Sequence, residues 1–183
     1  YSIYRGDFMR TAKTAAFAGV LTAMSVVLLF VGVIVSPLSY VLPIATGLLM
    51  ILLIESVSVK SALLTYFSTS FLSFILFGGK ETVLFYVFFF GYYPILRLTL
   101  SKIKIKFLRF ILKLLIFNVA MAGVQLVLIY VFGIPFDNMF GKMGIALFFV
   151  ALNLIFILYD FTFDMLVTIY DKKLKRKITG IIK

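Results

Sequence analysis

Six long apolar stretches, separated by short polar segments, form the main pattern along this chain. Their expected ranges are Ala12–Val35, Pro43–Val59, Ser61–Phe77, Thr82–Leu100, Phe107–Phe132 and Met143–Tyr170. Most approach or exceed the roughly 20 residues that a helix needs to cross a bilayer. Runs such as Leu48–Ile54 are apolar at every position, unlike the alternating strands of a membrane barrel. The pattern therefore predicts an all-α integral membrane protein: one bundle of about six transmembrane helices.

We expect a single transmembrane domain over residues 1–183, with residues 1–8, which precede Met9, as a leader or expression remnant. Hydrophobic residues make up 63% of the chain and charged residues only 14%. A soluble domain carries roughly a quarter of its residues as charged side chains. A fold of this size also has too small an interior to hide so much apolar surface, so much of that surface must face lipid.

The charged and reactive residue types exclude several functions. The net charge is +11, but the basic residues come in short bursts between apolar runs, so we expect no nucleic-acid partner. The chain has no Cys and no His, which removes thiol and histidine chemistry and the usual zinc ligands. It also lacks the GxxxxGK[ST] loop that cradles nucleotide phosphates. We expect no catalytic residues, no metal and no cofactor.

Lys and Arg placement predicts the orientation, because cytoplasmic loops are enriched in these residues. With six helices and both termini in the cytoplasm, 16 of the 18 basic residues fall inside, and only Lys80 and Lys142 are left outside. The segment Lys102–Arg109 alternates charged and apolar residues, which is typical of the inner headgroup surface. These features predict a multi-pass protein of the cell membrane, in contact with membrane lipid.

Polar residues inside the apolar stretches form a candidate intramembrane cluster. Its members are Glu55, Arg97, Lys113, Asn118, Asn153, Asp160 and Asp164. One hypothesis is an ion or proton relay; the alternative, which we favour, is ion pairing of the acids with Arg97, Lys113 or Lys60. Thr65, Thr69 and Ser73 form a hydroxyl stripe in the third helix, and Pro94 predicts a kink in the fourth.

Small residues recur along the first helix. Ala12, Ala15, Ala16, Gly19 and Ala23 form one smooth face, which allows another helix to approach closely. The face predicts either packing within this bundle or docking on a separate membrane subunit.

A third candidate site lies at the outer ends of the helices. A few polar groups converging on apolar walls are typical of small-molecule sites. The candidate lining is Tyr40, Lys80, Glu81, Tyr86, Gln125, Asp137 and Asn138. The alternative is that these residues are simply solvated loop residues.

The first helix, with Arg10 and Lys13 followed by TAKTAAFAGVLTAMSVVL, resembles that of the substrate-binding S-components of energy-coupling-factor vitamin transporters, as do helix number and orientation. The stretches FFFGYYPILR, LKLLIFN and LYDFTFDMLVTIY are also similar to those of small Gram-positive membrane proteins. The S-component resemblance implies binding of a vitamin or micronutrient near the outer face, without catalysis. It also implies a coupling transmembrane subunit and ATPase subunits as partners. The ligand itself is not specified by these residues.

Two further hypotheses remain open beside transport. One is an interaction or scaffold subunit that holds a partner protein or anionic lipid through its first helix and basic inner surface. An intramembrane enzyme would need Asp160 and Asp164 to converge with a nucleophile or a metal, and we do not favour it.

Overall fold

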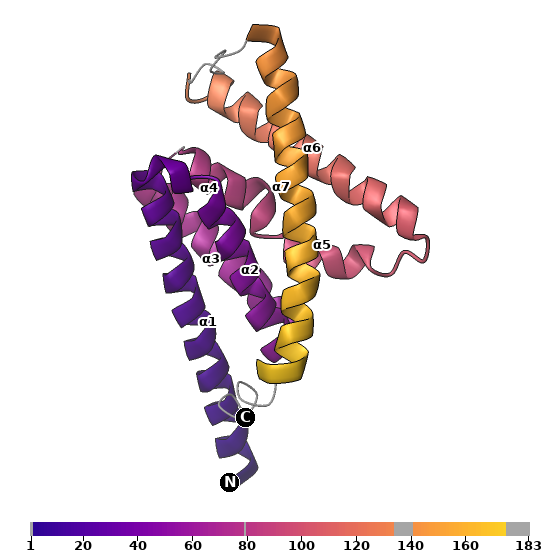
Figure 1. Cartoon of the computed structure of the whole chain (residues 1–183). Helices are drawn as coiled ribbons and strands as arrows, with labels where there is room; N and C mark the ends of the chain where they lie inside the picture. The colour runs from indigo at the N-terminus through magenta and orange to yellow at the C-terminus, as the bar shows by residue number, and fades with distance from the viewer. Residues whose placement is uncertain (1, 79, 134–140, 175–183) are drawn as a thin grey trace.

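The computed structural model describes residues 2–78, 80–133 and 141–174, and all the regular structure in these ranges is helical (Figure 1). The long helices are α1 (Ser2–Ile34), α2 (Val41–Ser56), α3 (Val59–Phe77), α6 (Lys106–Tyr130) and α7 (Gly141–Ile169). The fourth apolar stretch is divided into α4 (Glu81–Phe85), the π-helical segment η2 (Tyr86–Phe90) and α5 (Tyr93–Leu100). A short 3-10 turn, η1 (Ser36–Leu38), precedes α2, and a π-helical turn, η3 (Tyr170–Leu174), follows α7.

Within the described residues, five helical segments are long and apolar enough to cross a membrane. The exception is α2, whose 16 residues span only about 24 Å. The helical fold and the six apolar helical stretches are therefore confirmed for the described residues, and they are consistent with a bundle that crosses a membrane. The first helix begins earlier than expected, because α1 starts at Ser2, ten residues before Ala12.

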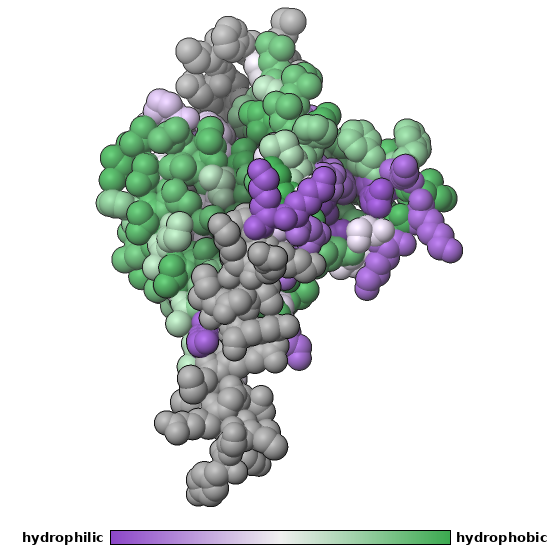
Figure 2. Space-filling view, turned by 60° about the horizontal axis from the view of Figure 1, so that its bottom comes forward, coloured by the Kyte–Doolittle hydropathy of each residue, from purple (hydrophilic) through white to green (hydrophobic). Residues whose placement is uncertain are grey.

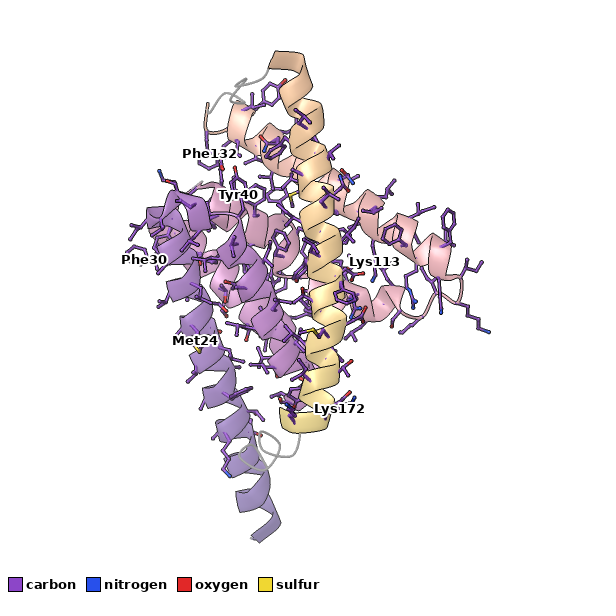
Figure 3. The ribbon with its side chains drawn as sticks, in the orientation of Figure 1. Met24, Phe30, Tyr40, Lys113, Phe132 and Lys172 are labelled. Atoms are coloured by element: carbon purple, nitrogen blue, oxygen red, sulfur yellow. The ribbon has the colours of Figure 1, made fainter. Side chains whose placement is uncertain are left out.

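Most helix ends lie at two opposite ends of the molecule, with the α5–α6 turn between them at the side (Figure 1). α1 begins and α7 finishes near one end, whereas the α1–α2 and α3–α4 connections lie at the other (Figure 1). Tyr40 and Phe132 mark the second end and Lys172 the first (Figure 3). Because the start of α1 and the finish of α7 lie near the same end, the chain passes between the two ends an even number of times. Which end faces the cytoplasm remains a prediction from the placement of Lys and Arg.

α3 has a polar buried face and an apolar exposed face, which is the reverse of a helix in a soluble protein. Its buried residues are Ala62, Thr65, Thr69 and Ser73, so the predicted hydroxyl stripe faces the bundle. The exposed residues are large and apolar: Leu64 is 68% exposed and Phe71 is 67% exposed. Small hydroxyl residues let membrane helices approach closely, while the large apolar side chains suit lipid. Figure 2 shows broad hydrophobic surface around one hydrophilic area.

The fourth helix breaks just before Pro94, as expected. Its π-helical segment is closed by the Gly91 amide, which donates to the Tyr86 carbonyl at 2.8 Å. Pro94 has no amide hydrogen, so it cannot bond to the carbonyl of Phe90 four residues earlier. That carbonyl lies against α2 at Gly47, where a Cβ would sit 2.5 Å from the Phe90 oxygen. Glycine at this position therefore lets the broken helix pack directly on α2.

An aromatic core joins the broken helix to α6 and α7. The Phe89 ring lies 5.0 Å from that of Phe117 and 5.6 Å from that of Phe156, measured between centroids. Phe117 and Phe156 themselves stack at 4.6 Å. A second buried cluster, which includes Leu29, Leu53 and Tyr86, joins α1, α2 and α3 to η2. The segment η2 thus contributes to both halves of the core.

Two glycine substitutions test this packing. Gly47→Ala should lower the free energy of unfolding by about 1–3 kcal/mol, because its methyl group would collide with the Phe90 carbonyl and the Tyr159 hydroxyl. Gly19→Ala, where an added Cβ meets no atom within 4 Å, should be neutral or raise stability by up to about 1 kcal/mol. Reversible unfolding in mild detergent measures both values. Equal effects would contradict the close contact between α2 and the broken helix.

Candidate functional site: an ion-pair cluster and a cationic cavity

The Asp160 carboxylate on α7 is the centre of the intramembrane polar cluster. Its Oδ1 accepts hydrogen bonds from the Tyr93 hydroxyl at 2.6 Å, from Arg97 Nε at 3.0 Å and from Lys113 Nζ at 2.8 Å. Lys113 Nζ also lies 2.6 Å from Oδ2. Arg97 uses Nη2 to pair with Asp164, and its guanidinium lies 4.5 Å from the centre of the Phe163 ring. Charge-assisted bonds of this kind are among the stronger hydrogen bonds in proteins.

Local helix geometry brings these groups together. Tyr93 and Arg97 are four residues apart on α5, as are Asp160 and Asp164 on α7, so each pair projects from one side of its helix. The break before Pro94 redirects α5 toward α7 (Figure 1). Lys113 comes from α6 and is only 7% exposed. Three helices therefore supply two cations and two carboxylates, whose formal charges cancel.

The arrangement supports structural ion pairing over a relay. Asp160 accepts hydrogen bonds from three donors, two of them cationic, so its charge is compensated by fixed partners. Asp164 was expected to face the bundle but is 67% exposed, and it contacts the cluster through Arg97. Lys60, the third cation considered, lies exposed in the first turn of α3. Among the described residues, no group of three His, Cys, Asp or Glu could hold a metal ion.

A pair of amides joins α6 and α7 further along the same faces. The Asn118 Nδ2 donates to Asn153 Oδ1 at 2.8 Å, and the Asn153 Nδ2 donates to Asn118 Oδ1 at 3.0 Å. Each Nδ2 also donates to the carbonyl four residues earlier in its own helix, at Leu114 and Phe149. Reciprocal amides of this type hold membrane helices together without exposing polar groups to lipid.

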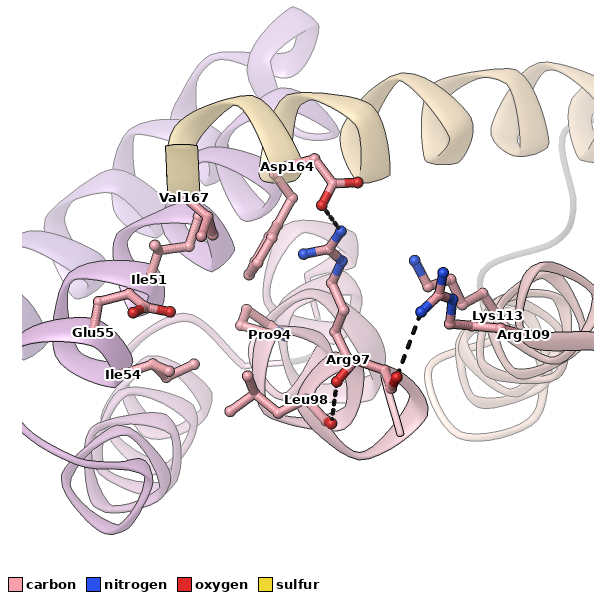
Figure 4. A pocket seen from close by; sticks show the side chains of 12 residues that line it. Ile51, Ile54, Glu55, Pro94, Arg97, Leu98, Arg109, Lys113, Asp164 and Val167 are labelled. Atoms are coloured by element: carbon pink, nitrogen blue, oxygen red, sulfur yellow. Dashed lines mark hydrogen bonds and ion pairs between the residues drawn. The ribbon is translucent and has the colours of Figure 1, made fainter. Parts of the chain in front are cut away.

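A cavity of about 220 Å³ lies beside the ion-pair cluster (Figure 4). It opens between α2, α5, α6 and α7, and Glu55 lines it together with Arg97, Lys113 and Asp164. The full lining is Ile51, Ile54, Glu55, Pro94, Arg97, Leu98, Ser101, Arg109, Lys113, Phe163, Asp164 and Val167. Every charged member of the predicted polar cluster except Asp160 therefore faces this one space. The cavity lies among residues that the charge pattern assigns to the inner half of the membrane.

The expected outer site is only partly assembled. The Tyr40 hydroxyl donates to Glu81 Oε2 at 3.1 Å, and partial burial, together with the Glu81 charge, raises the pKa of Tyr40 to about 12. Lys80 is exposed beside this contact, and Gln125 is half-buried on α6. Tyr86 does not join them: it is fully buried among α1, α2 and α3, because it faces the core from η2.

Two further members of the outer set, Asp137 and Asn138, lie outside the described residues. A cavity of about 10 Å³ lies beneath Tyr40, lined by apolar residues that include Phe85 and Phe117. That volume holds at most one water molecule, whereas small-molecule sites measure roughly 300–1,000 Å³.

The small-residue face of α1 is exposed in this chain. Ala12, Ala15, Ala16, Gly19 and Ala23 are all on the surface. Within the described residues, α1 packs on α2 and α3 through its other side, with Leu21, Ser25 and Leu29 buried, and not through this face.

Some contributors to the cavity and cluster were missed by sequence reasoning. Tyr93 was not included in the predicted cluster, although its spacing of four from Arg97 placed both on one side of α5. Arg109 was assigned to the membrane surface and Ser101 to no site, and only the turn between α5 and α6 brings them to the cavity. Comparisons with known proteins add no assignment, since no protein-family model, curated protein or solved structure matches the chain.

Removal of the Asp160 charge tests the structural role of the cluster. Asp160→Asn should lower the free energy of unfolding by about 3 kcal/mol, because it leaves Lys113 and Arg97 without their shared partner. Asp164→Asn should cost less than about 1 kcal/mol, since Asp164 is largely exposed. The double variant Asp160→Asn, Lys113→Met should recover much of the loss. Unfolding in detergent measures all three, and an unchanged Asp160→Asn protein would refute a structural role.

Proposed function

We propose that this chain is the substrate-binding subunit of an uptake transporter for a small solute such as a vitamin or micronutrient. Like an S-component, such a subunit needs a separate coupling subunit in the membrane and ATPase subunits that supply the energy. The chain itself is a binding protein, not an enzyme. By this resemblance the solute binds at the end of the bundle that carries Tyr40, Lys80 and Glu81, where the cavity of about 10 Å³ would have to widen to admit it.

The observation that carries this proposal is the exposed small-residue face of α1. Helices that meet only lipid have no need of small side chains, and α3 exposes large ones such as Leu64, Phe67 and Phe71. Over Ala12–Ala23, the exposed residues of α1 are mainly Ala and Gly, with Lys13 and Val20 among them, and its larger exposed side chains Met24, Val27, Phe30 and Ile34 follow farther along. Small residues at a membrane helix surface favour close packing with another helix. The face therefore supports docking of a second membrane protein.

The same face also supports a second candidate, a scaffold subunit that holds a partner protein without transporting a solute. The basic surface formed by Lys102, Lys104 and Lys106 favours this alternative, because it would attract an acidic partner or anionic lipid. The two candidates differ in what binds to the chain. A transporter subunit binds a solute and associates with a module that contains ATPases, whereas a scaffold subunit binds a partner protein and transports no solute.

A bulky residue in the small-residue face tests docking. Gly19→Leu should abolish copurification of the coupling subunit, because the leucine side chain would hold the helices apart. The fold should survive, since a Cβ at position 19 meets no atom within 4 Å. Val27→Phe is the matched control: it adds bulk at an exposed position of the same helix and should leave assembly intact. Assembly of Gly19→Leu at the parental level would refute the docking face.

Native mass spectrometry of the complex extracted from its host membrane separates the two candidates. A bound small solute, or an attached module of coupling subunit and ATPases, is expected for the transporter subunit. A chain that carries only an unrelated membrane protein would support the scaffold and contradict transport.

A further inference from the structure

The cavity beside the ion-pair cluster has one cationic wall and one apolar wall. Arg97, Arg109 and Lys113 stand on one side, with Ser101 between the helices that carry them. Ile51, Ile54 and Val167 form the apolar part. Figure 4 shows Glu55 at the far side of the cavity from Arg109, with Arg97 between them. The space is thus electrically divided: it favours an anion near Arg109 and disfavours one near Glu55.

Of the three cations in this wall, Arg109 has the fewest of its N–H groups engaged in the hydrogen bonds and ion pairs described above. Arg97 and Lys113 are compensated by Asp160 and Asp164. By contrast, the contact that the structure gives Arg109 is a long bond of 3.5 Å from Nη1 to the carbonyl of Ser101. A guanidinium has five N–H donors, and two parallel ones match a phosphate.

The sequence around Arg109 adds to the positive potential. Lys102, Lys104 and Lys106 precede it, and no acidic residue occurs between Thr82 and Phe136. The three lysines are exposed, as are Ile105 and Phe107 between and beside them. Alternating cations and exposed apolar side chains fit a segment lying among lipid headgroups.

An apolar cavity of about 150 Å³ lies next to the first one. It is lined by Leu48, Ile51 and Leu52 of α2 and by Leu166, Ile169 and Tyr170 of α7 and η3. Ile51 lines both cavities, so the two spaces adjoin. At the same helix ends, the hydroxyls of Ser56 and Tyr170 lie 2.6 Å apart and tie α2 to η3. A cationic space adjoining an apolar one is complementary to an anionic amphiphile.

We propose that these two cavities form a binding site for one anionic phospholipid of the inner leaflet. The phosphate lies between Arg109 and Arg97, near Ser101, and the start of an acyl chain occupies the apolar cavity between α2 and α7. A soluble phosphate would leave the apolar cavity empty. A zwitterionic choline lipid has no net charge, so the basic turn would attract it less than an anionic lipid. The site does not rest on the proposed transport function, because lipid bound here would serve either candidate.

The test measures lipid retained by the full-length chain. The purified protein, exchanged into detergent with equal phosphatidylglycerol and phosphatidylcholine, is examined by native mass spectrometry. We expect one tightly held phosphatidylglycerol. Arg109→Gln should weaken its binding about tenfold, through loss of charge-assisted hydrogen bonds. Lys106→Gln is the matched control: it removes one charge from the same helix but does not line the cavity, so its effect should stay below about twofold.

A second variant probes the acyl-chain cavity without touching any charge. Leu166→Trp should fill part of that cavity and weaken retention of phosphatidylglycerol, while binding of inorganic phosphate stays unchanged. It also provides a test if Arg109→Gln fails to fold.

Three results would overturn the proposal. The first is equal losses for Arg109→Gln and Lys106→Gln, which would indicate diffuse electrostatic attraction. The second is equal retention of the two lipids. The third is binding of inorganic phosphate as tight as that of the lipid, which would point to a soluble anion.

Discussion

The bond network around Asp160 is the interaction on which the arrangement of α5, α6 and α7 depends. A charge inside a membrane is tolerated only when it is paired, and here one carboxylate accepts from Tyr93, Arg97 and Lys113 together. The pairing fixes the direction of α5, since Arg97 must reach α7. It also fixes the crossing of α6 over α7, since Lys113 must reach the same atoms. The cavity beside the network lies where α2, α5, α6 and α7 meet around these ion pairs.

Packing elsewhere follows from the absence of a hydrophobic driving force between helices in lipid. Close approach must come from small side chains, backbone fit and aromatic contacts. Gly47 lets α2 meet the carbonyl of Phe90, and Thr65, Thr69 and Ser73 let α3 sit against the bundle. The aromatic rings around Phe89 then fill the space among η2, α6 and α7. The large apolar side chains that a soluble protein would bury are left on the surface.

The sequence was sufficient to predict the helical stretches and the break before Pro94, because both depend on local properties: apolar length and a missing amide hydrogen. It also indicated that Asp160 pairs with Arg97 or Lys113, because unpaired charges in lipid are costly. The sequence could not reveal that Tyr86 turns into the core. Its burial follows from the packing of the broken fourth helix on α1, α2 and α3, which are distant in the sequence. The contribution of Arg109 to the cavity depends on a turn whose geometry no local pattern specifies.

The candidate binding features of this chain lie in one half of the bundle. The small-residue face of α1, the basic turn between α5 and α6 and the cation-lined cavity all belong to the half that the Lys and Arg pattern assigns to the cytoplasmic side. Large apolar side chains are exposed in both halves, for example Leu64 and Phe107 in this half and Val27 and Ile75 in the other, so contact with lipid alone does not distinguish the two. The proposed transport function requires a partner on the cytoplasmic side, where ATP is available. The position of the small-residue face and the basic turn is what docking on such a partner would require, and an anionic lipid held between α2 and α7 would stabilise the same half.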